Sequence, residues 1–251
     1  QLSVPFLGIT VNGNTNWISI AGFTLQPAEF LKVALIMYMA WFVSNREHEL
    51  DDPRRVLLPV LIVGGAALAL VMLGRDLGTA IIIALIVFGT LVIAGAPLRP
   101  LVQVFIGVAI AGALAAFSSA SRMARINAWL NPDAASSDAF NWQYEHGTWA
   151  LAAGGVFGVG LGNSKMKWSW IPEVENDFIF AVIGEELGLI GALLVIGIFA
   201  LLVSSLIGIM NRSDSSFGRI IIIGVIVWIV SQSAVNIAVV LGVLPVLGVP
   251  L

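Results

Sequence analysis

The sequence predicts an all-α membrane protein whose chain crosses the bilayer several times. Of its 251 residues, 59% are hydrophobic and only 11% are charged, and the mean hydropathy is +0.98. Long apolar runs alternate with short polar turns. A bilayer core about 30 Å thick is crossed by about 20 apolar residues in a helix, which satisfies its own backbone. This composition excludes a soluble enzyme.

Six apolar runs are long enough to be membrane-spanning helices. We expect them at residues 28–44, 56–73, 77–95, 101–118, 178–210 and 220–241. Pro27 suits the first turn of the first helix. At about 1.5 Å per residue, the run 178–210 is much longer than the bilayer core, so this helix should tilt, kink or project from the membrane. Residues 1–27 are rich in turn formers and are expected to form a loop.

A long polar region, residues 119–176, separates the fourth and fifth expected spans. It is far longer than an ordinary connection, and such loops are usually functional or separately structured. Residues 147–162 within it are apolar and rich in glycine. This stretch is too short for a full span, so we expect a re-entrant or interfacial segment packed in protein.

Lysine and arginine predict the orientation of the chain. Six of them lie in the turns 45–55, 96–100 and 211–219, against one in 1–27 and 74–76 together. The positive-inside rule places the first set in the cytoplasm. The region 119–176 is therefore expected outside, with the polar ends of the helices next to it.

Several site classes are excluded or disfavoured by the composition. The chain has no cysteine, which excludes disulfides, thiolate metal sites and cysteine nucleophiles. His48 and His146 are far apart in sequence, so a histidine-built metal site is disfavoured. A net charge of −3 gives no basic surface for nucleic acid.

Acidic residues next to or inside apolar runs are the main candidates for function. Asp177 precedes the longest run, and Glu185 and Glu186 lie within it. A carboxylate in a membrane is costly and marks a functional site by default. The alternative for Asp177, and equally for Asp76, is a helix N-cap. Adjacent glutamates diverge by about 100° on a helix, and a structural ion pair is their alternative role.

One cation lies within an expected span. Lys32 is three residues after Glu29, on the same helix face and close enough to pair. We predict a structural set of buried charges that comprises Glu29, Lys32, Glu185 and Glu186. Small residues at four-residue spacing (Gly107, Ala111 and Ala115), and Gly224, permit close approach of a partner helix or of a helix within the bundle.

Ordered motifs give the sequence a family resemblance. They are Asn16-Trp-Ile, Gln26-Pro-Ala-Glu-Phe-x-Lys32, Asp76-Leu-Gly-Thr79, Arg122-x-x-Arg125-Ile, the glycine repeat 154–162, Pro172-Glu-x-x-x-Asp177-Phe-Ile-Phe, Gly184-Glu-Glu-Leu-Gly188, Asn236 and Gly242-x-Leu-Pro-x-x-Gly248. In this order they resemble the SEDS family, which includes FtsW, RodA and SpoVE. The resemblance implies a ten-helix glycosyltransferase, of which this chain is an internal fragment. The tryptophan-rich stretch after Lys167 favours the division member, FtsW, over RodA.

The family resemblance implies both a reaction and residues that carry it. The enzyme joins lipid II units into peptidoglycan strands at the outer face of the bacterial cytoplasmic membrane, at the division septum for an FtsW-like member. Asp177 is the implied catalytic carboxylate. The residues proposed to bind substrate are Asp76, Arg122, Arg125, Lys165 and Lys167, and ordinary surface or lipid-headgroup contact is the alternative for the four cations. The sequence leaves open whether a divalent cation, Mg²⁺ or Mn²⁺, is required.

The resemblance also implies partner proteins, and other functions compete with the enzymatic one. The partners are a class B penicillin-binding protein that crosslinks the strands and other membrane proteins of the division machinery. Competing functions are a lipid II flippase, a scaffold without catalytic activity and an elongation role like that of RodA. The sequence departs from the family pattern at three places. Gly74-Arg75 replaces the usual Gln-Pro, Val246-Leu247 replaces a frequent Thr-Lys, and Asn16 stands where arginine is frequent.

Overall fold

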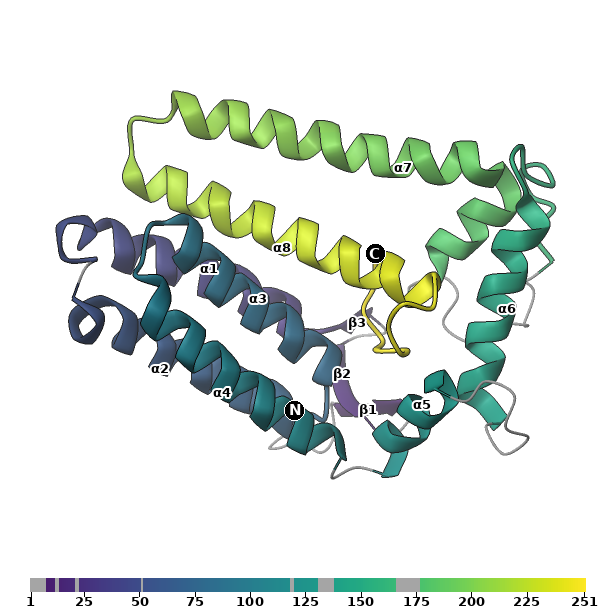
Figure 1. Ribbon diagram of the computed structural model, residues 1–251, viewed down its shortest axis with the longest axis horizontal. Helices are drawn as coiled ribbons and strands as arrows, with labels where there is room; N and C mark the ends of the chain where they lie inside the picture. Colours follow the sequence, from purple (N-terminus) through teal and green to yellow (C-terminus); the bar gives the residue numbers. More distant parts are fainter. Residues whose placement is uncertain are drawn as a thin grey trace. The chain divides into compact units, whose positions relative to one another are not determined.

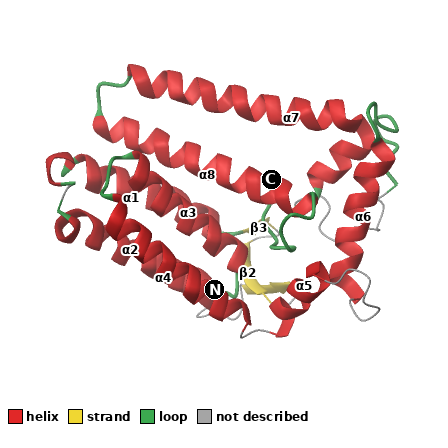
Figure 2. Cartoon of the chain, viewed as in Figure 1, coloured by secondary structure: helices red, strands yellow, loops and turns green. Residues whose placement is uncertain are grey.

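The computed structural model describes residues 8–11, 14–20, 23–50, 52–117, 120–130, 138–165 and 177–251. Helices make up most of this part of the chain, and strands are confined to its N-terminal end (Figure 2). The helical elements are α1 (Pro27–Ser44), η1 (Glu47–Glu49), η2 (Pro53–Leu57), α2 (Leu58–Leu73), α3 (Leu77–Ile93), α4 (Leu98–Phe117), α5 (Ala120–Leu130), α6 (Asp138–Gly154), α7 (Ile179–Arg212) and α8 (Ser216–Val240). The all-α polytopic fold class is confirmed.

The long apolar helices correspond to the predicted spans. Within the described residues, five helices are long and apolar enough to cross a membrane: Pro27–Ser44, Pro53–Leu73, Leu98–Phe117, Ile179–Arg212 and Ser216–Val240. Each begins and ends within a few residues of its prediction. The remaining expected span, 77–95, is the shorter apolar helix α3 of 17 residues.

The chain forms two compact units. The first contains Gln1–Ile110 and Leu206–Ser231, and the second contains Ala111–Ser205 and Gln232–Leu251. The course of the chain through them is drawn in Figure 1, where α7 and α8 each supply residues to both units. The expectation of a single membrane domain stays a prediction.

Glycines allow close helix packing within the first unit. A Cβ at Gly89 of α3 would lie 2.7 Å from Val227 of α8, and one at Gly224 would lie 2.7 Å from Ile36 of α1. Gly224 is therefore used inside the bundle, which is the alternative that the sequence left open for it. No described atom lies within 4 Å of a Cβ at Gly107, so Gly107 has room for a neighbour.

The N-terminal segment contains a small sheet where the sequence predicted a loop. The strands β1 (Gly8–Val11), β2 (Asn14–Ile20) and β3 (Phe23–Leu25) pair antiparallel in the order β1-β2-β3. The prediction considered the turn residues alone. The Asn12-Gly13 dipeptide between runs of β-branched residues is the typical sequence of a hairpin turn.

The second unit contains a break in its longest helix. In α7, Gly188 has φ 67° and ψ −163°, which no helical residue adopts. The glycine-rich turn after α6 pairs with the broken backbone: Val159 N–H donates to the Glu185 carbonyl at 2.9 Å, and Leu189 N–H donates to the Gly155 carbonyl at 2.9 Å. These bonds satisfy groups that a helix end leaves unpaired. Of the three expected ways to fit this helix, the kink is confirmed.

Glycine is required where α6 and its following turn meet α7. A Cβ at Gly154 would lie 1.9 Å from the Gly184 carbonyl oxygen, and one at Gly158 would lie 2.1 Å from the Glu186 carbonyl oxygen. Residues 147–162 thus comprise the end of α6 and a turn packed on protein backbone. Their expected re-entrant or interfacial position in the membrane stays a prediction.

Candidate functional site

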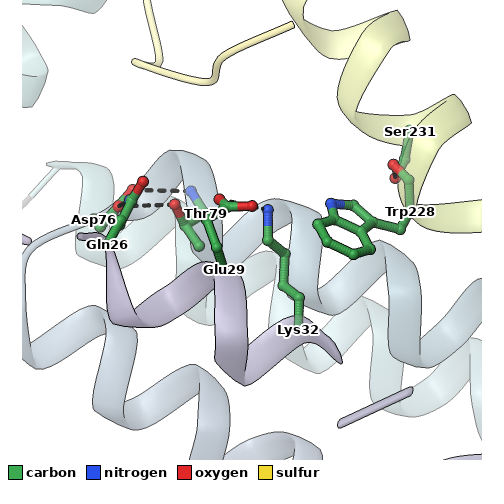
Figure 3. A network of polar contacts seen from close by, with 7 residues as sticks. All are labelled: Gln26, Glu29, Lys32, Asp76, Thr79, Trp228 and Ser231. Carbon is green, nitrogen blue, oxygen red and sulfur yellow. Dashed lines mark hydrogen bonds and ion pairs between the residues drawn. The ribbon is translucent and has the colours of Figure 1, made fainter. Parts of the chain in front are cut away.

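Asp76 lies at one end of a polar cluster in the first unit (Figure 3). It is the N-cap of α3: its Oδ1 accepts from Thr79 N–H at 2.9 Å. Its Oδ2 accepts from Thr79 Oγ1 at 2.8 Å and from Gln26 Nε2 at 3.2 Å. Only 7% of Asp76 is exposed. The carboxylate therefore joins the start of α1 to the start of α3, which is the capping role that the sequence left open.

Lys32 lies in the same cluster and pairs as its spacing predicted. Its Nζ is 2.7 Å from Glu29 Oε1 and 4.7 Å from the centroid of the Trp228 ring. Figure 3 shows the ammonium group between the carboxylate and the indole. The lysine is 2% exposed, so its charge depends on these partners, and a cation over tryptophan contributes about 0.5–2 kcal/mol. The cluster thus connects α1 with α8.

Asp177 is held in the second unit through its main chain. The amide nitrogen of Asn236 in α8 donates to the Asp177 carbonyl oxygen at 2.9 Å and to the Val249 carbonyl oxygen at 2.7 Å. Asn236 is 1% exposed, whereas Asp177 is half-buried. The side chain of Asn236 thus bridges Asp177, two residues before α7, and the loop after α8.

The loop after α8, residues 241–251, lies against the carboxylate of Asp177. A Cβ at Gly248 would be 3.6 Å from Asp177 Oδ2. Gly248 has φ 69°, a left-handed conformation that favours glycine. We call residues 241–251 the C-terminal loop. Its main chain lies beside the carboxylate of the candidate base.

The predicted cations have different positions. Arg125 of α5 donates to the Val246 carbonyl of the C-terminal loop at 3.3 Å, so the structure brings it to the loop that contacts Asp177. Arg122 donates to the Ala115 carbonyl in the last turn of α4 at 2.9 Å, as basic residues do at helix C-termini. Lys165 is exposed. Lys167 lies outside the described residues.

Glu185 and Glu186 bind the chain that follows the glycine-rich turn. Glu185 accepts from Ser164 Oγ at 2.5 Å and from Lys165 N–H at 3.1 Å. Glu186 accepts from Ser164 N–H at 3.3 Å. Glu185 is 2% exposed, and the groups that donate to it are neutral. Of the four residues predicted to form ion pairs, the structure shows Glu29 and Lys32 paired with each other.

Some site residues were missed by the sequence reading. Trp129 donates its indole N–H to the Gly242 carbonyl at 2.8 Å, and Trp228 contacts Lys32. The position of Trp129, four residues after Arg125 on one helix face, is a signal that sequence reading can use. Among the described residues, no three His, Asp or Glu side chains are grouped to hold a metal ion, so no residues are assigned to a divalent cation.

Comparison with known proteins decides the family. The model of the cell cycle protein family that comprises FtsW, RodA and SpoVE matches residues 2–251. This chain belongs to that family. The resemblance seen in the motifs is thereby confirmed.

Curated relatives agree with the family model. The chain is 38% identical over 248 residues to a protein of Mycobacterium tuberculosis named probable peptidoglycan glycosyltransferase FtsW, covering 99% of this chain and 47% of the relative. It is 34% identical over 252 residues to stage V sporulation protein E of Bacillus subtilis, covering 99% and 68%. The chain is FtsW-like within the family, and it spans about half the length of the mycobacterial relative.

Solved structures agree on the fold. One solved chain superposes with a TM-score of 0.76 at 24% identity, covering 100% of this chain and 69% of that one. It comes from work on the structural coordination of polymerization and crosslinking by a peptidoglycan synthase complex. The rod shape determining protein RodA of Thermus thermophilus gives a TM-score of 0.61 at 22% identity, covering 99% and 64%. At these identities the likeness supports the SEDS fold alone.

Proposed function

We propose that the protein containing this chain polymerises peptidoglycan strands from lipid II at the outer face of the bacterial cytoplasmic membrane. Support comes from the family, from relatives named peptidoglycan glycosyltransferase at 38% identity over 99% of the chain, and from several apolar helices suited to a membrane. An FtsW-like member is proposed to act at the division septum.

The proposed reaction is an inverting glycosyl transfer. The 4-hydroxyl of the acceptor sugar attacks the anomeric carbon of the donor, the bond to undecaprenyl pyrophosphate breaks, and a base accepts the hydroxyl proton. A pyrophosphate departs without protonation when its charge is neutralised, so one carboxylate suffices where a glycosidase needs two. Asp177 is the proposed base.

The position of Asp177 carries this assignment. It lies at the start of the longest apolar helix, half-buried, with its main chain bonded to Asn236 and its carboxylate beside the C-terminal loop. The bond from Asn236 to the Asp177 carbonyl holds the main chain of the proposed base in one position, which favours a constant geometry toward substrate. The pyrophosphate charge is assigned to the cations Arg122, Lys165 and Lys167, and arginine suits it by bidentate contact. The fourth predicted cation, Arg125, donates to the Val246 carbonyl of the C-terminal loop.

A crosslinking partner is part of the proposal. One solved chain with the same fold comes from work on a complex that coordinates polymerization with crosslinking. We assign a class B penicillin-binding protein to this chain as its partner, together with other membrane proteins of the division machinery.

The direct test is strand formation by the full-length protein purified in detergent. Incubation with purified lipid II should give a ladder of glycan products on a gel, and a heat-inactivated sample should give none. A sample that moves lipid II across vesicle bilayers without elongating it would support the flippase. Elongation only by the partner, stimulated by this protein, would support the scaffold.

A further inference from the structure

We propose that Arg125 and Trp129 of α5 and Asn236 of α8 clamp the main chain of the C-terminal loop and thereby set the position of the Asp177 carboxylate. Arg125 is then a positioning residue that does not contact the pyrophosphate. This inference rests on the proposed function for its effect on catalysis. The clamp itself can be tested by hydrogen exchange, independently of catalysis.

The first half of the clamp is one face of α5. Arg125 and Trp129 are four residues apart and therefore lie one above the other on the helix. Arg125 donates to the Val246 carbonyl at 3.3 Å, and Trp129 donates to the Gly242 carbonyl at 2.8 Å. Two donors at successive turns of α5 thus reach two carbonyls that are also four residues apart, and they fix the first part of the loop.

The second half of the clamp is Asn236. Its amide nitrogen bonds the Val249 carbonyl at 2.7 Å and the Asp177 carbonyl at 2.9 Å. Because Asn236 is 1% exposed, no bulk water replaces these bonds when the amide is removed. The end of the loop and the main chain of Asp177 therefore share one anchor.

The clamped stretch contacts the carboxylate between its anchors. Gly248 lies between Val246 and Val249, and a Cβ there would be 3.6 Å from Asp177 Oδ2. The main chain of the loop therefore approaches the carboxylate at Gly248. The φ of 69° at this residue is a backbone conformation that glycine adopts readily. Movement of the loop would change the surroundings of the carboxylate directly.

The clamp is independent of the loop's side chains. All three of its loop acceptors are main-chain carbonyls, at positions 242, 246 and 249. Every residue type supplies such an acceptor. The pair Val246-Leu247, which stands where relatives frequently have Thr-Lys, therefore leaves the clamp intact.

A positioning role predicts a particular kinetic effect. A general base acts over about 2.6–3.2 Å from the proton that it accepts, and misplacement by about 1 Å lowers the rate roughly a hundredfold. Loosening the loop should therefore lower kcat and leave KM for lipid II unchanged. Loss of a pyrophosphate contact made equally in the ground and transition states should instead raise KM.

The experiment uses the full-length protein with Trp129→Phe, Arg125→Gln, Arg125→Lys and Asn236→Leu. Trp129→Phe removes the indole N–H and carries no charge, so it separates positioning from charge. Trp149→Phe, at an exposed tryptophan of α6, is the matched control. Lipid II polymerisation gives kcat and KM, and hydrogen exchange measured by mass spectrometry gives the protection of peptides from residues 241–251.

We expect Trp129→Phe and Arg125→Gln each to lower kcat about tenfold with KM within about twofold, and to speed exchange in the C-terminal loop. Arg125→Lys, which keeps a donor, should recover part of kcat. The clamp is overturned when loop exchange stays at the wild-type rate in Trp129→Phe, Arg125→Gln and Asn236→Leu, or when Arg125→Gln raises KM alone. A wild-type protein that does not elongate lipid II would refute the proposed function, and loop exchange would still decide the clamp.

Discussion

Asp76 and Asp177 occupy similar places in the sequence and different environments in the structure. Each precedes an apolar helix. The carboxylate of Asp76 accepts three hydrogen bonds from Thr79 and Gln26, whereas Asp177 accepts the Asn236 bond through its main-chain carbonyl and directs its carboxylate toward Gly248. The same residue type therefore serves helix capping in one unit and is positioned by its backbone in the other.

The three bonds to its carboxylate identify Asp76 as a structural acid, and the family motif makes Asp177 the candidate base. An aspartate whose oxygens bind fixed donors in the folded protein stabilises the fold and is poorly placed to take a proton from substrate. The buried charges follow the same division. Glu29 and Lys32 bind each other, and Glu185 binds Ser164 and the main chain. These residues maintain the framework around the sites, and their substitution should act first on stability.

The largest expected loss of stability comes from Lys32→Met. Removing the ammonium group leaves Glu29 without its partner, and because the Glu29 side chain is 36% exposed the cost should lie in the lower part of the about 3–5 kcal/mol range of a fully buried pair. Thermal and denaturant unfolding in detergent measure the loss. The double variant Lys32→Met/Glu29→Gln should recover part of it. Wild-type stability of the single variant, or no coupling to Glu29, would show that the pair does not hold the first unit together.

Gly154→Ala should be the next most destabilising change. Its Cβ would lie 1.9 Å from the Gly184 carbonyl oxygen, so α6 must move away from α7, at a cost of about 1–3 kcal/mol. Gly107→Ala is the matched control because no described atom lies within 4 Å of its Cβ. Equal unfolding midpoints for both variants would contradict the close contact.

Asp76→Ala should cost less, about 0.5–2 kcal/mol, because it removes the N-cap of α3. Asp76→Asn keeps an acceptor oxygen and should recover most of the loss. Unfolding of the two variants, measured side by side, tests the structural role assigned to Asp76. If Asp76→Ala unfolds like the wild type and loses polymerising activity, Asp76 belongs with Asp177 and the comparison fails.

The smallest effect on stability is expected at Gly107 of α4. Gly107→Leu should leave the unfolding midpoint nearly unchanged and weaken co-purification of the proposed transpeptidase, because close helix approach requires small residues. Gly224→Leu is the contrasting variant, since Gly224 packs on Ile36 and a larger side chain should destabilise the first unit. If Gly107→Leu binds the partner as well as the wild type does, the partner does not dock on this face of α4.

Much of the fold could be predicted because hydropathy alone locates long apolar helices. Charge spacing also predicted that Glu29 and Lys32 pair, since both lie on one helix face. The sheet at the N-terminus was missed because the alternation of β-branched residues around the Asn12-Gly13 sequence was not weighed, and residues 1–27 were predicted as a loop from their turn formers alone. The kink in α7 was expected from length, but its place at Gly188 depends on backbone partners from the 155–160 turn.

The candidate site was predicted less completely for a physical reason. Asp177 and Arg125 were candidates because of their residue types and the family motifs. Their connection through the C-terminal loop was not predictable, because its acceptors are main-chain carbonyls that leave no mark in the sequence. Trp228 was missed because its contact with Lys32 joins helices that are far apart in the chain.

The most direct test of the central claim is lipid II polymerisation by purified full-length Asp177→Asn, with Asp214→Asn, at an exposed residue of the 211–219 turn, as the control. Asparagine preserves the size of the side chain and removes the base, and loss of a general base lowers rates about 10²–10⁴-fold. We predict that Asp177→Asn folds with the wild-type unfolding midpoint and forms no detectable strands, while Asp214→Asn elongates normally. Strand formation by Asp177→Asn at a rate near that of the wild type would contradict the account.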